Sequence, residues 1–318
     1  MKNLLLILLL LLTGEISAQQ TATIVVKTTP DNEIAYWPTG KDHLFFITLG
    51  TKAQADPQGQ FVHEFSMSRP TTIHVWAKGN NSFTLYLTPG SKDTIAVAKD
   101  TINFSGTNRV YNRCLKAVDD YQQYSDNLIY MQPHELEGVT SLEQYHQLAD
   151  ARMKQALDSV NASGLDKEFL VEQRAHIDYT YRSIFLHVAM YLVKNENFTE
   201  NWRKELAEII NQPVDSDYLR SYRGIGLFIN DLIGAQFIKL ENGKPEEIKD
   251  YCAFRFDRYR KFFKGDNLQY AQALLIYEDE FQTRNTPSIP QLYERYKVEF
   301  PNSPFLSVLE PGVNKNLR

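Results

Sequence analysis

Short runs in which apolar and polar residues alternate fill the first third of the chain, from about Thr21 to Ser105. Such alternation puts one set of side chains on each face of an extended segment and predicts β-strands. We expect strands at 24–26, 44–49, 60–65, 71–77, 83–87, 94–98 and 102–104. Turn signals rich in Pro, Gly, Asn and Asp separate most of these segments. Short strands at this spacing are typical of an antiparallel β-sandwich.

The spacing of apolar residues becomes helical after Gly106. Ser141 and Gln144 have the spacing of a capping box, which predicts the start of a helix. Further helices are expected at 167–194, 200–211, 215–240, 245–263, 269–283 and 290–300. The predicted fold class is therefore α+β and multidomain. An N-terminal antiparallel β-sandwich domain would occupy residues 19–106, an all-α helical domain residues 107–310, and a C-terminal tail residues 311–318.

Residues 1–18 have the pattern of an export signal. Lys2 supplies the positive charge, an unbroken apolar run extends from Leu4 to Leu12, and Ile16-Ser17-Ala18 fits the cleavage pattern. A membrane-spanning helix needs about 20 apolar residues, roughly twice the length of this run. We therefore expect a signal peptide that is cleaved before Gln19, no transmembrane span, and a periplasmic or secreted location.

Composition narrows the possible partners. The chain of 318 residues has 34 basic and 39 acidic residues, for a net charge of −5, so it lacks the basic footprint of a nucleic-acid-binding protein. Aromatic and basic residues do interleave between 254 and 264. A helix that turns its aromatics to the core and coats its outer face with cations explains this stretch. The cations are Arg255, Arg258, Arg260, Lys261 and Lys264.

The chain has two cysteines, Cys114 and Cys252. An exported compartment permits a disulfide between them. Two separate buried thiols are the alternative, and the apolar helical stripe around Cys252 favours it because free cysteine packs as a small hydrophobic residue.

One histidine has the sequence context of a metal ligand. Glu143 and His146 have the spacing of one half of a helical di-iron site, but a second Glu-x-x-His is missing, and both residues lie on a polar helix face. We therefore expect Glu143 and His146 to lie on a solvent-exposed helix face rather than in a metal site. His63 and His74 are expected to be exposed, on strand faces opposite the apolar ones.

Two other helical patterns have structural explanations. His176 and His187 share a stripe with Thr180 and Ser183, and they lie too many turns apart to bind one ion. We expect this stripe to pack against a neighbouring helix or solvent. Gly224-Ile225-Gly226 lacks the third glycine of a dinucleotide fingerprint and indicates close helix packing instead.

The stretch from Thr21 to Leu115 carries a series of motifs in a fixed order. They are Asp56-x-x-Gly59-x-Phe61, Pro70-Thr71, the run from Phe83 to Ser91 that includes Pro89-Gly90, and Phe104-Ser105-Gly106-Thr107-Asn108. This stretch resembles the N-terminal β-domain of envelope thiol–disulfide oxidoreductases of the TlpA type. In that family an acid usually follows the Pro-Gly turn, whereas here Ser91 stands there and Asp93 comes later. The helical segment that ends in Phe300-Pro301-Asn302-Ser303-Pro304 resembles the linker of such proteins.

The resemblance does not imply redox activity. In that family the chemistry belongs to a C-terminal thioredoxin domain with a Cys-x-x-Cys motif, which neither Cys114 nor Cys252 matches. We assign no catalytic, cofactor-binding or metal-ligating residue, and the sequence favours a protein that is not an enzyme. The expected function is that of a non-catalytic exported envelope module that binds or scaffolds a partner protein or ligand. The alternative is the accessory portion of a TlpA-type oxidoreductase system, with a thioredoxin-like protein as partner.

Overall fold

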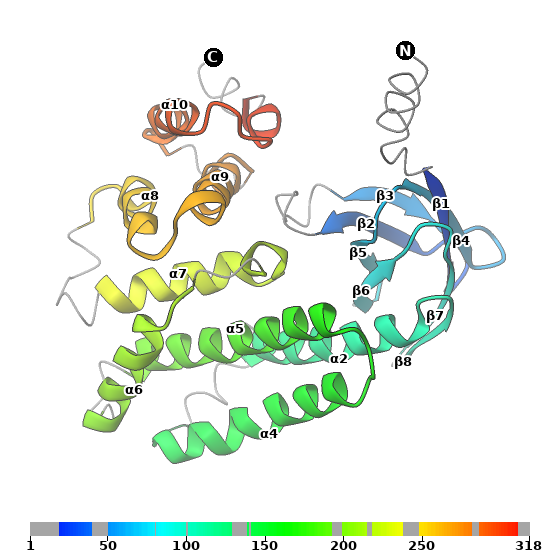
Figure 1. Ribbon diagram of the computed structural model, residues 1–318, viewed down its shortest axis with the longest axis horizontal. Helices are drawn as coiled ribbons and strands as arrows, with labels where there is room; N and C mark the ends of the chain where they lie inside the picture. Colours follow the sequence, from blue (N-terminus) through cyan, green and yellow to red (C-terminus); the bar gives the residue numbers. More distant parts are fainter. Residues whose placement is uncertain are drawn as a thin grey trace, which may run out of the picture. The chain divides into compact units, whose positions relative to one another are not determined.

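A computed structural model describes residues 19–39, 50–79, 81–99, 101–128, 139, 141–192, 199–214, 218–237, 248–281 and 286–310 (Figure 1). The predicted signal peptide at 1–18, the predicted strand at 44–49 and the predicted tail at 311–318 lie outside these residues. The chain divides into two compact units. The first comprises Met1–Tyr36 and Lys52–Asn112, and the second comprises Trp37–Thr51 and Arg113–Arg318.

Eight described strands form two four-stranded sheets. One sheet has the order β4 (Gln60–Met67), β1 (Gln20–Lys27), β7 (Lys92–Ala98), β8 (Thr101–Gly106). The other has the order β3 (Thr51–Gln54), β2 (Glu33–Thr39), β5 (Thr71–Ala77), β6 (Asn81–Leu87). The strands appear in blue to cyan in Figure 1.

The sheets are rich in antiparallel pairs, as the sequence predicts, with one difference. The pairs β1–β4, β5–β6 and β7–β8 are antiparallel, but β1 and β7 run parallel, with Thr23 opposite Lys92 and Lys27 opposite Ala96. Parallel neighbours need a long connection, and the strands between β1 and β7 supply it. The alternation of apolar and polar residues within a strand does not indicate whether the strand pairs parallel or antiparallel with its neighbour.

Alternating side chains from both sheets form one hydrophobic cluster. Ile24, Ile34, Val75, Phe83, Leu85 and Ile95 are all fully buried members of it. Their burial confirms the faces predicted for 71–77 and 83–87, because residues two apart in a strand point to the same side.

The described helices are α2 (Arg109–Asp126), α4 (Leu142–Asn161), α5 (Lys167–Leu192), α6 (Glu200–Asn211), a 3₁₀ turn η3 (Leu219–Ser221), α7 (Ile225–Ala235), α8 (Tyr251–Phe262), α9 (Gly265–Phe281) and α10 (Ile289–Glu299). The predicted capping box at Ser141 and Gln144 is present. The single helix predicted over 215–240 is wrong. Tyr222 has an extended backbone that separates η3 from α7, which begins after Gly224.

Helix α5 packs against α4, α6 and α7. Where it meets α4 and α6, the rings of Tyr145, Phe185 and Trp202 lie 5.2 to 5.7 Å apart, and all three are fully buried. Offset and edge-on ring packing of this kind adds to the stabilisation from burial. Among the described helices, none has both the length and the apolar character that crossing a bilayer requires.

Helix α8 departs from the predicted division between an aromatic core face and a cationic outer face. Arg255 is only 4% exposed, and its guanidinium donates to the Tyr259 hydroxyl at 2.8 Å and lies 3.8 Å from Glu278 of α9. Phe254, predicted for the core, is only half-buried. The carboxylate of Glu278 on α9 explains the exchange, because a buried cation is tolerated when it is paired.

Candidate functional site

A polar stripe runs along α5 and faces inward. His176, Thr180 and Ser183 are buried and His187 is half-buried, at the three- and four-residue spacing of one helix face. Of the two predicted environments for this stripe, a neighbouring helix or solvent, the structure shows the first, since α7 packs against α5. His176, Thr180 and the pair of Ser183 and His187 each have different partners. The stripe therefore forms three clusters rather than one site.

The central cluster joins α2, α5 and the residue that follows η3. Thr180 Oγ1 lies 2.9 Å from Gln122 Oε1 and 2.9 Å from the Tyr222 hydroxyl. Gln122 Oε1 and the His176 carbonyl oxygen, which also lies 2.9 Å away, only accept, so Thr180 directs its one proton to these two acceptors and receives the proton of Tyr222. Burial raises the pKa of Tyr222, so the phenol keeps its proton to donate.

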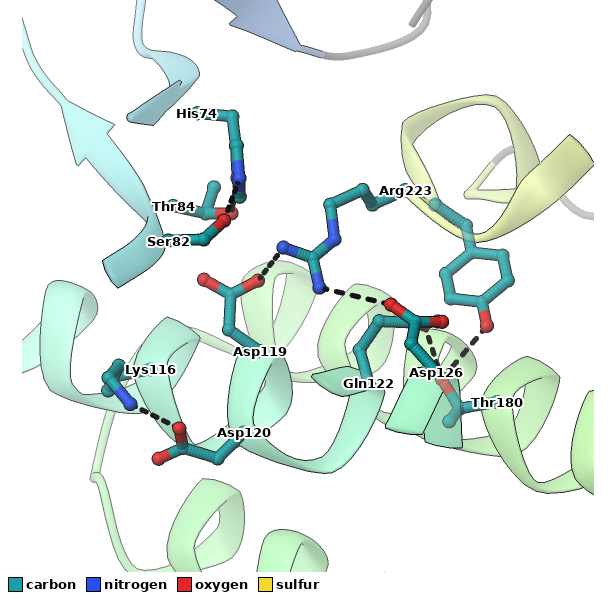
Figure 2. A network of polar contacts seen from close by, with 11 residues as sticks. His74, Ser82, Thr84, Lys116, Asp119, Asp120, Gln122, Asp126, Thr180 and Arg223 are labelled. Carbon is teal, nitrogen blue, oxygen red and sulfur yellow. Dashed lines mark hydrogen bonds and ion pairs between the residues drawn. The ribbon is translucent and has the colours of Figure 1, made fainter. Parts of the chain in front are cut away.

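Figure 2 shows Arg223 reaching toward two carboxylates of α2 beside this chain of hydroxyls. Its guanidinium lies 3.7 Å from Asp119 and 4.0 Å from Asp126, and Gln122 donates to Asp126 at 3.0 Å. Burial raises the pKa of Asp126, and Arg223 and Gln122 oppose the shift. The arrangement ties α2 to the segment that leads into α7. Nearby on α2, Lys116 pairs with Asp120.

The cluster at the start of the stripe brings a serine, a histidine and a carboxylate together. Ser221 Oγ lies 2.5 Å from Glu172 and 3.0 Å from His176 Nε2, and that nitrogen also lies 3.2 Å from the Tyr218 carbonyl. A nitrogen that faces a carbonyl must donate, so it does not take the serine proton as the base of a hydrolase does. Burial lowers the pKa of His176, with Glu172 and Tyr218 opposing. These contacts hold η3 against α5.

The third cluster comprises Ser183 and His187 of α5 and Asp231 of α7. His187 Nδ1 lies 3.7 Å from Asp231 Oδ1, and Asp231 is 6% exposed. Burial raises the pKa of Asp231, and both His187 and Ser183 oppose that shift.

Both cysteines are free and buried, which confirms the prediction of two separate thiols. Burial raises the pKa of Cys114 to about 11 and that of Cys252 to about 11. Cys252 Sγ lies 3.3 Å from Asp279, a carboxylate that disfavours the thiolate further. Attack on a disulfide requires a thiolate, so neither environment activates its sulfur.

The motif residues of the first unit shape its turns. Asp56 Oδ1 accepts from the backbone nitrogens of Gln58 and Gln60, at 2.9 and 2.7 Å. Gly59 has φ +74°, and a Cβ there would lie 2.2 Å from the Thr28 carbonyl oxygen. Ser91, at the position where the TlpA-type family usually has an acid, is 1% exposed. Asp56 and Gly59 therefore determine the backbone conformation of one turn of the first unit.

The prediction of exposed histidines in the first unit is wrong. His74 is 3% exposed, with its ring nitrogens 3.1 Å from Thr84 and 2.5 Å from Ser82 (Figure 2). His63 is half-buried and lies edge-on to Phe65, with 4.5 Å between ring centroids. It shares a strand face with its aromatic neighbours because alternate residues point the same way.

The remaining motifs have structural roles. Glu143 is exposed as predicted, but His146 is only partly so and lies 3.3 Å from Glu205 of α6. No cluster of three or more His, Cys, Asp or Glu in the described part of the chain has metal-site geometry. The close packing predicted around the glycine pair is confirmed. A Cβ on Gly224 would lie 2.5 Å from the Tyr222 hydroxyl, and one on Gly226 would lie 2.8 Å from Glu278.

A group of aromatic side chains with one arginine extends the stretch 254–264, which the sequence pattern explained by a core face and a cationic outer face, to Phe237 and Tyr251. Tyr251 is 47% exposed, and Phe254, Phe237 and Arg258 are half-buried beside it. The Phe237 and Phe254 rings lie 4.7 Å apart, and the Arg258 guanidinium lies 5.0 Å from the Phe254 ring. We call these four residues the α8 aromatic patch. The spacing of 251, 254 and 258 along one helix face was a usable signal.

Comparisons of the chain with protein-family models, with curated proteins and with solved structures found no match in any of the three.

Proposed function

We propose that this chain is a non-catalytic exported module of the cell envelope that binds or scaffolds a partner protein. Under this proposal Met1 to Ala18 is a signal peptide, and the mature chain is periplasmic or secreted. It would have a β-sandwich domain over 19–106 and a helical domain over 107–310. The hydrophobic cluster shared by both sheets supports the sandwich.

The α8 aromatic patch is the observation that carries the proposal. Tyrosine, phenylalanine and arginine are enriched in the centres of protein–protein interfaces, where a few such residues supply most of the binding energy. Arg258 stacks over Phe254, and a cation held against a ring loses less conformational entropy on binding. Tyr251 adds an exposed ring 6.2 Å from that of Phe254.

The charges of this helix face indicate the chemistry of the partner. Positions 251, 254, 258 and 261 follow one another along the face and include two cations and no carboxylate. The acid of α8, Asp257, is bridged instead to Arg295 of α10 at 2.5 Å. A complementary partner would present acidic side chains next to an apolar anchor, because like charges across an interface are costly.

Site-specific photo-crosslinking in the exporting organism tests the proposal. A photoreactive amino acid would replace Tyr251 in the patch or, as a control, Val171 on α5, which is 36% exposed. We expect one defined protein adduct from position 251 and none from position 171. Arg258→Glu should reduce the adduct at least tenfold. Equal adducts from both positions, or an adduct insensitive to Arg258→Glu, would contradict partner binding through this patch.

The alternative function is the accessory portion of a TlpA-type oxidoreductase system. Its support is that Asp56 and Gly59, which carry the resemblance, determine a turn of the first unit. A thioredoxin-like envelope protein would then be the partner. A binding titration of the mature chain with a purified TlpA-type thioredoxin domain distinguishes the two proposed functions. Saturable binding favours the alternative, whereas a crosslinked partner with no thioredoxin-like domain rejects it.

A further inference from the structure

Strand β4 lies at one end of its sheet and has one edge that no described strand covers. It pairs with β1 without a bulge over its whole length, from Gln60 opposite Lys27 to Met67 opposite Gln20. Its sequence, QFVHEFSM, contains no proline and no lysine. Natural sheets usually protect an end strand with a bulge, a proline, a lysine or a short length, because unpaired backbone groups can pair with a second chain.

The other end strands of the two sheets differ from β4. Strand β3 has only 4 residues, one of them Lys52, and β8 has 6. On β6 the side chain of Asn112 accepts from the backbone nitrogen of Tyr86 at 2.7 Å. With 8 residues, β4 is the longest of the described end strands.

The hydrogen bonds to β1 show which backbone groups of β4 point away from the sheet. In an antiparallel pair, alternate residues of each strand exchange hydrogen bonds with the neighbour. The Thr28 nitrogen donates to the Gly59 carbonyl oxygen at 2.7 Å, and the register continues from this pair along both strands. Odd-numbered residues of β4 therefore face β1, and even-numbered residues face away from it.

Three residues of β4 present unpaired groups at this edge. Gln60 already uses its outward groups, since its nitrogen donates to Asp56 Oδ1 and its carbonyl oxygen accepts from the Asp56 nitrogen, both at 2.7 Å. The outward groups of Val62, Glu64 and Ser66 have no partner among the described residues. All three side chains are exposed, and Val62 is 57% exposed. The edge is therefore accessible to another strand.

The side chains on the core side of this edge are incompletely covered. Phe61 is buried, but His63 and Phe65 are only half-buried. An added strand would cover both of them, because directly opposite residues of paired strands place their Cβ atoms about 4.5–5.5 Å apart.

We propose that β4 pairs antiparallel with β4 of a second copy of this chain, about a two-fold axis at His63, and so joins the four-stranded sheets of two copies into one. A two-fold axis lets the same strand supply both halves of the interface. The β4 edge is separate in sequence from the α8 aromatic patch, so the proposal goes beyond partner binding.

Charge and hydrogen bonding select this register. With the axis at His63, Val62 lies opposite Glu64 of the second copy, and the outward groups of both residues pair. On the core side Phe61 lies opposite Phe65, and aromatic pairs of this kind stabilise sheets. An axis at Glu64 would place that carboxylate opposite its own copy, which is unfavourable. An axis at Phe65 would leave the backbone groups of Val62 unpaired.

Charge substitutions at the edge test the proposal through the dimer dissociation constant, measured by sedimentation of the mature chain over a range of concentrations. Val62→Glu places like charges opposite each other twice in the dimer and should weaken it roughly tenfold. Val62→Lys, the matched control, places opposite charges there and should leave the dimer as tight as the wild type or tighter. The double variant Val62→Glu, Glu64→Lys should regain the lost affinity.

Disulfide crosslinking gives a second readout that reports the register itself. With the axis at His63, the two copies of that residue face each other with about 4.5 Å between Cα atoms, so His63→Cys should crosslink under mild oxidation. Glu64→Cys should not, because its copies would lie diagonally, about 7–8 Å apart. The native Cys114 and Cys252 are buried and should not contribute.

Several results would overturn the proposal. A mature chain that stays monomeric up to the submillimolar range has no such dimer. Equal effects of Val62→Glu and Val62→Lys would show that a dimer uses another surface. Crosslinking through Glu64→Cys in preference to His63→Cys would reject the register.

Discussion

The carboxylate of Asp93 accepts two hydrogen bonds from Asn108, one from the backbone nitrogen at 2.7 Å and one from the side-chain amide at 2.8 Å. Asp93 is 2% exposed and Asn108 is 3% exposed. We predict that Asp93→Ala lowers the free energy of unfolding by roughly 2–4 kcal/mol, because two buried donors lose a charged acceptor. Urea denaturation measures the change. Glu64→Ala, at an exposed position of β4, is the control and should cost far less.

Gly59→Ala should destabilise the chain more than Gly164→Ala. Both glycines have positive φ, +74° and +68°. An alanine at either position would therefore have an unfavourable left-handed backbone, at a cost of roughly 1–2 kcal/mol. Only at Gly59 would the new Cβ meet the Thr28 carbonyl oxygen, at 2.2 Å, whereas nothing lies within 4 Å of it at Gly164. Thermal denaturation of the two variants isolates the steric contribution. Equal losses of stability would show that the turn after Asp56 relaxes easily.

The two thiols should be inert in the native protein. With a pKa of about 11, each is a thiolate only to the order of one part in ten thousand at pH 7. We expect no reaction with an aromatic disulfide reagent in native buffer and two equivalents of reaction in denaturant. A disulfide-reductase assay should give no turnover above the reductant control. Rapid native labelling that Cys114→Ser or Cys252→Ser removes would contradict these environments.

Thr180→Val should destabilise the helical unit by roughly 1–3 kcal/mol, because Gln122 loses a donor and the Tyr222 hydroxyl loses an acceptor in a buried setting. Tyr222→Phe removes one end of the same chain of hydroxyls. The double variant should therefore cost less than the sum of the two single changes, by about 0.5 kcal/mol or more. Unfolding measurements on the full cycle give the coupling energy, and strict additivity would argue against the hydrogen-bond chain.

Cleavage of the predicted signal peptide would fix the N-terminus of the mature protein. N-terminal sequencing of material from an envelope fraction should read Gln19 as the first residue, because Ile16-Ser17-Ala18 fits the cleavage pattern. A substitution of Ala18 by a bulky residue should slow processing and leave a larger precursor. Membrane-bound protein that begins at Met1 would contradict cleavage.

The polar stripe of α5 could be read in part before the structure was known. The spacing of His176, Thr180, Ser183 and His187 places them on one face of any helix. Such a polar face either packs against a neighbouring helix or is exposed to solvent. Their partners Gln122, Ser221 and Asp231 come from elements distant in sequence. No local pattern indicates which of them meets which residue of the stripe, because the packing of the helices determines those contacts.

By itself, the sequence determined the properties that depend on neighbours a few residues apart. The faces of 71–77 and 83–87, the capping box at Ser141, and the closely packed glycines around Ile225 all follow from local periodicity or backbone freedom. Only the tertiary structure decided the parallel pairing of β1 with β7, the burial of His74, and the exchange by which Arg255 lies inside and Phe254 near the surface of α8. In each case a deciding partner lies on another strand or helix. A buried charge or imidazole is stable only where such a partner meets it, which is a property of packing and not of sequence spacing.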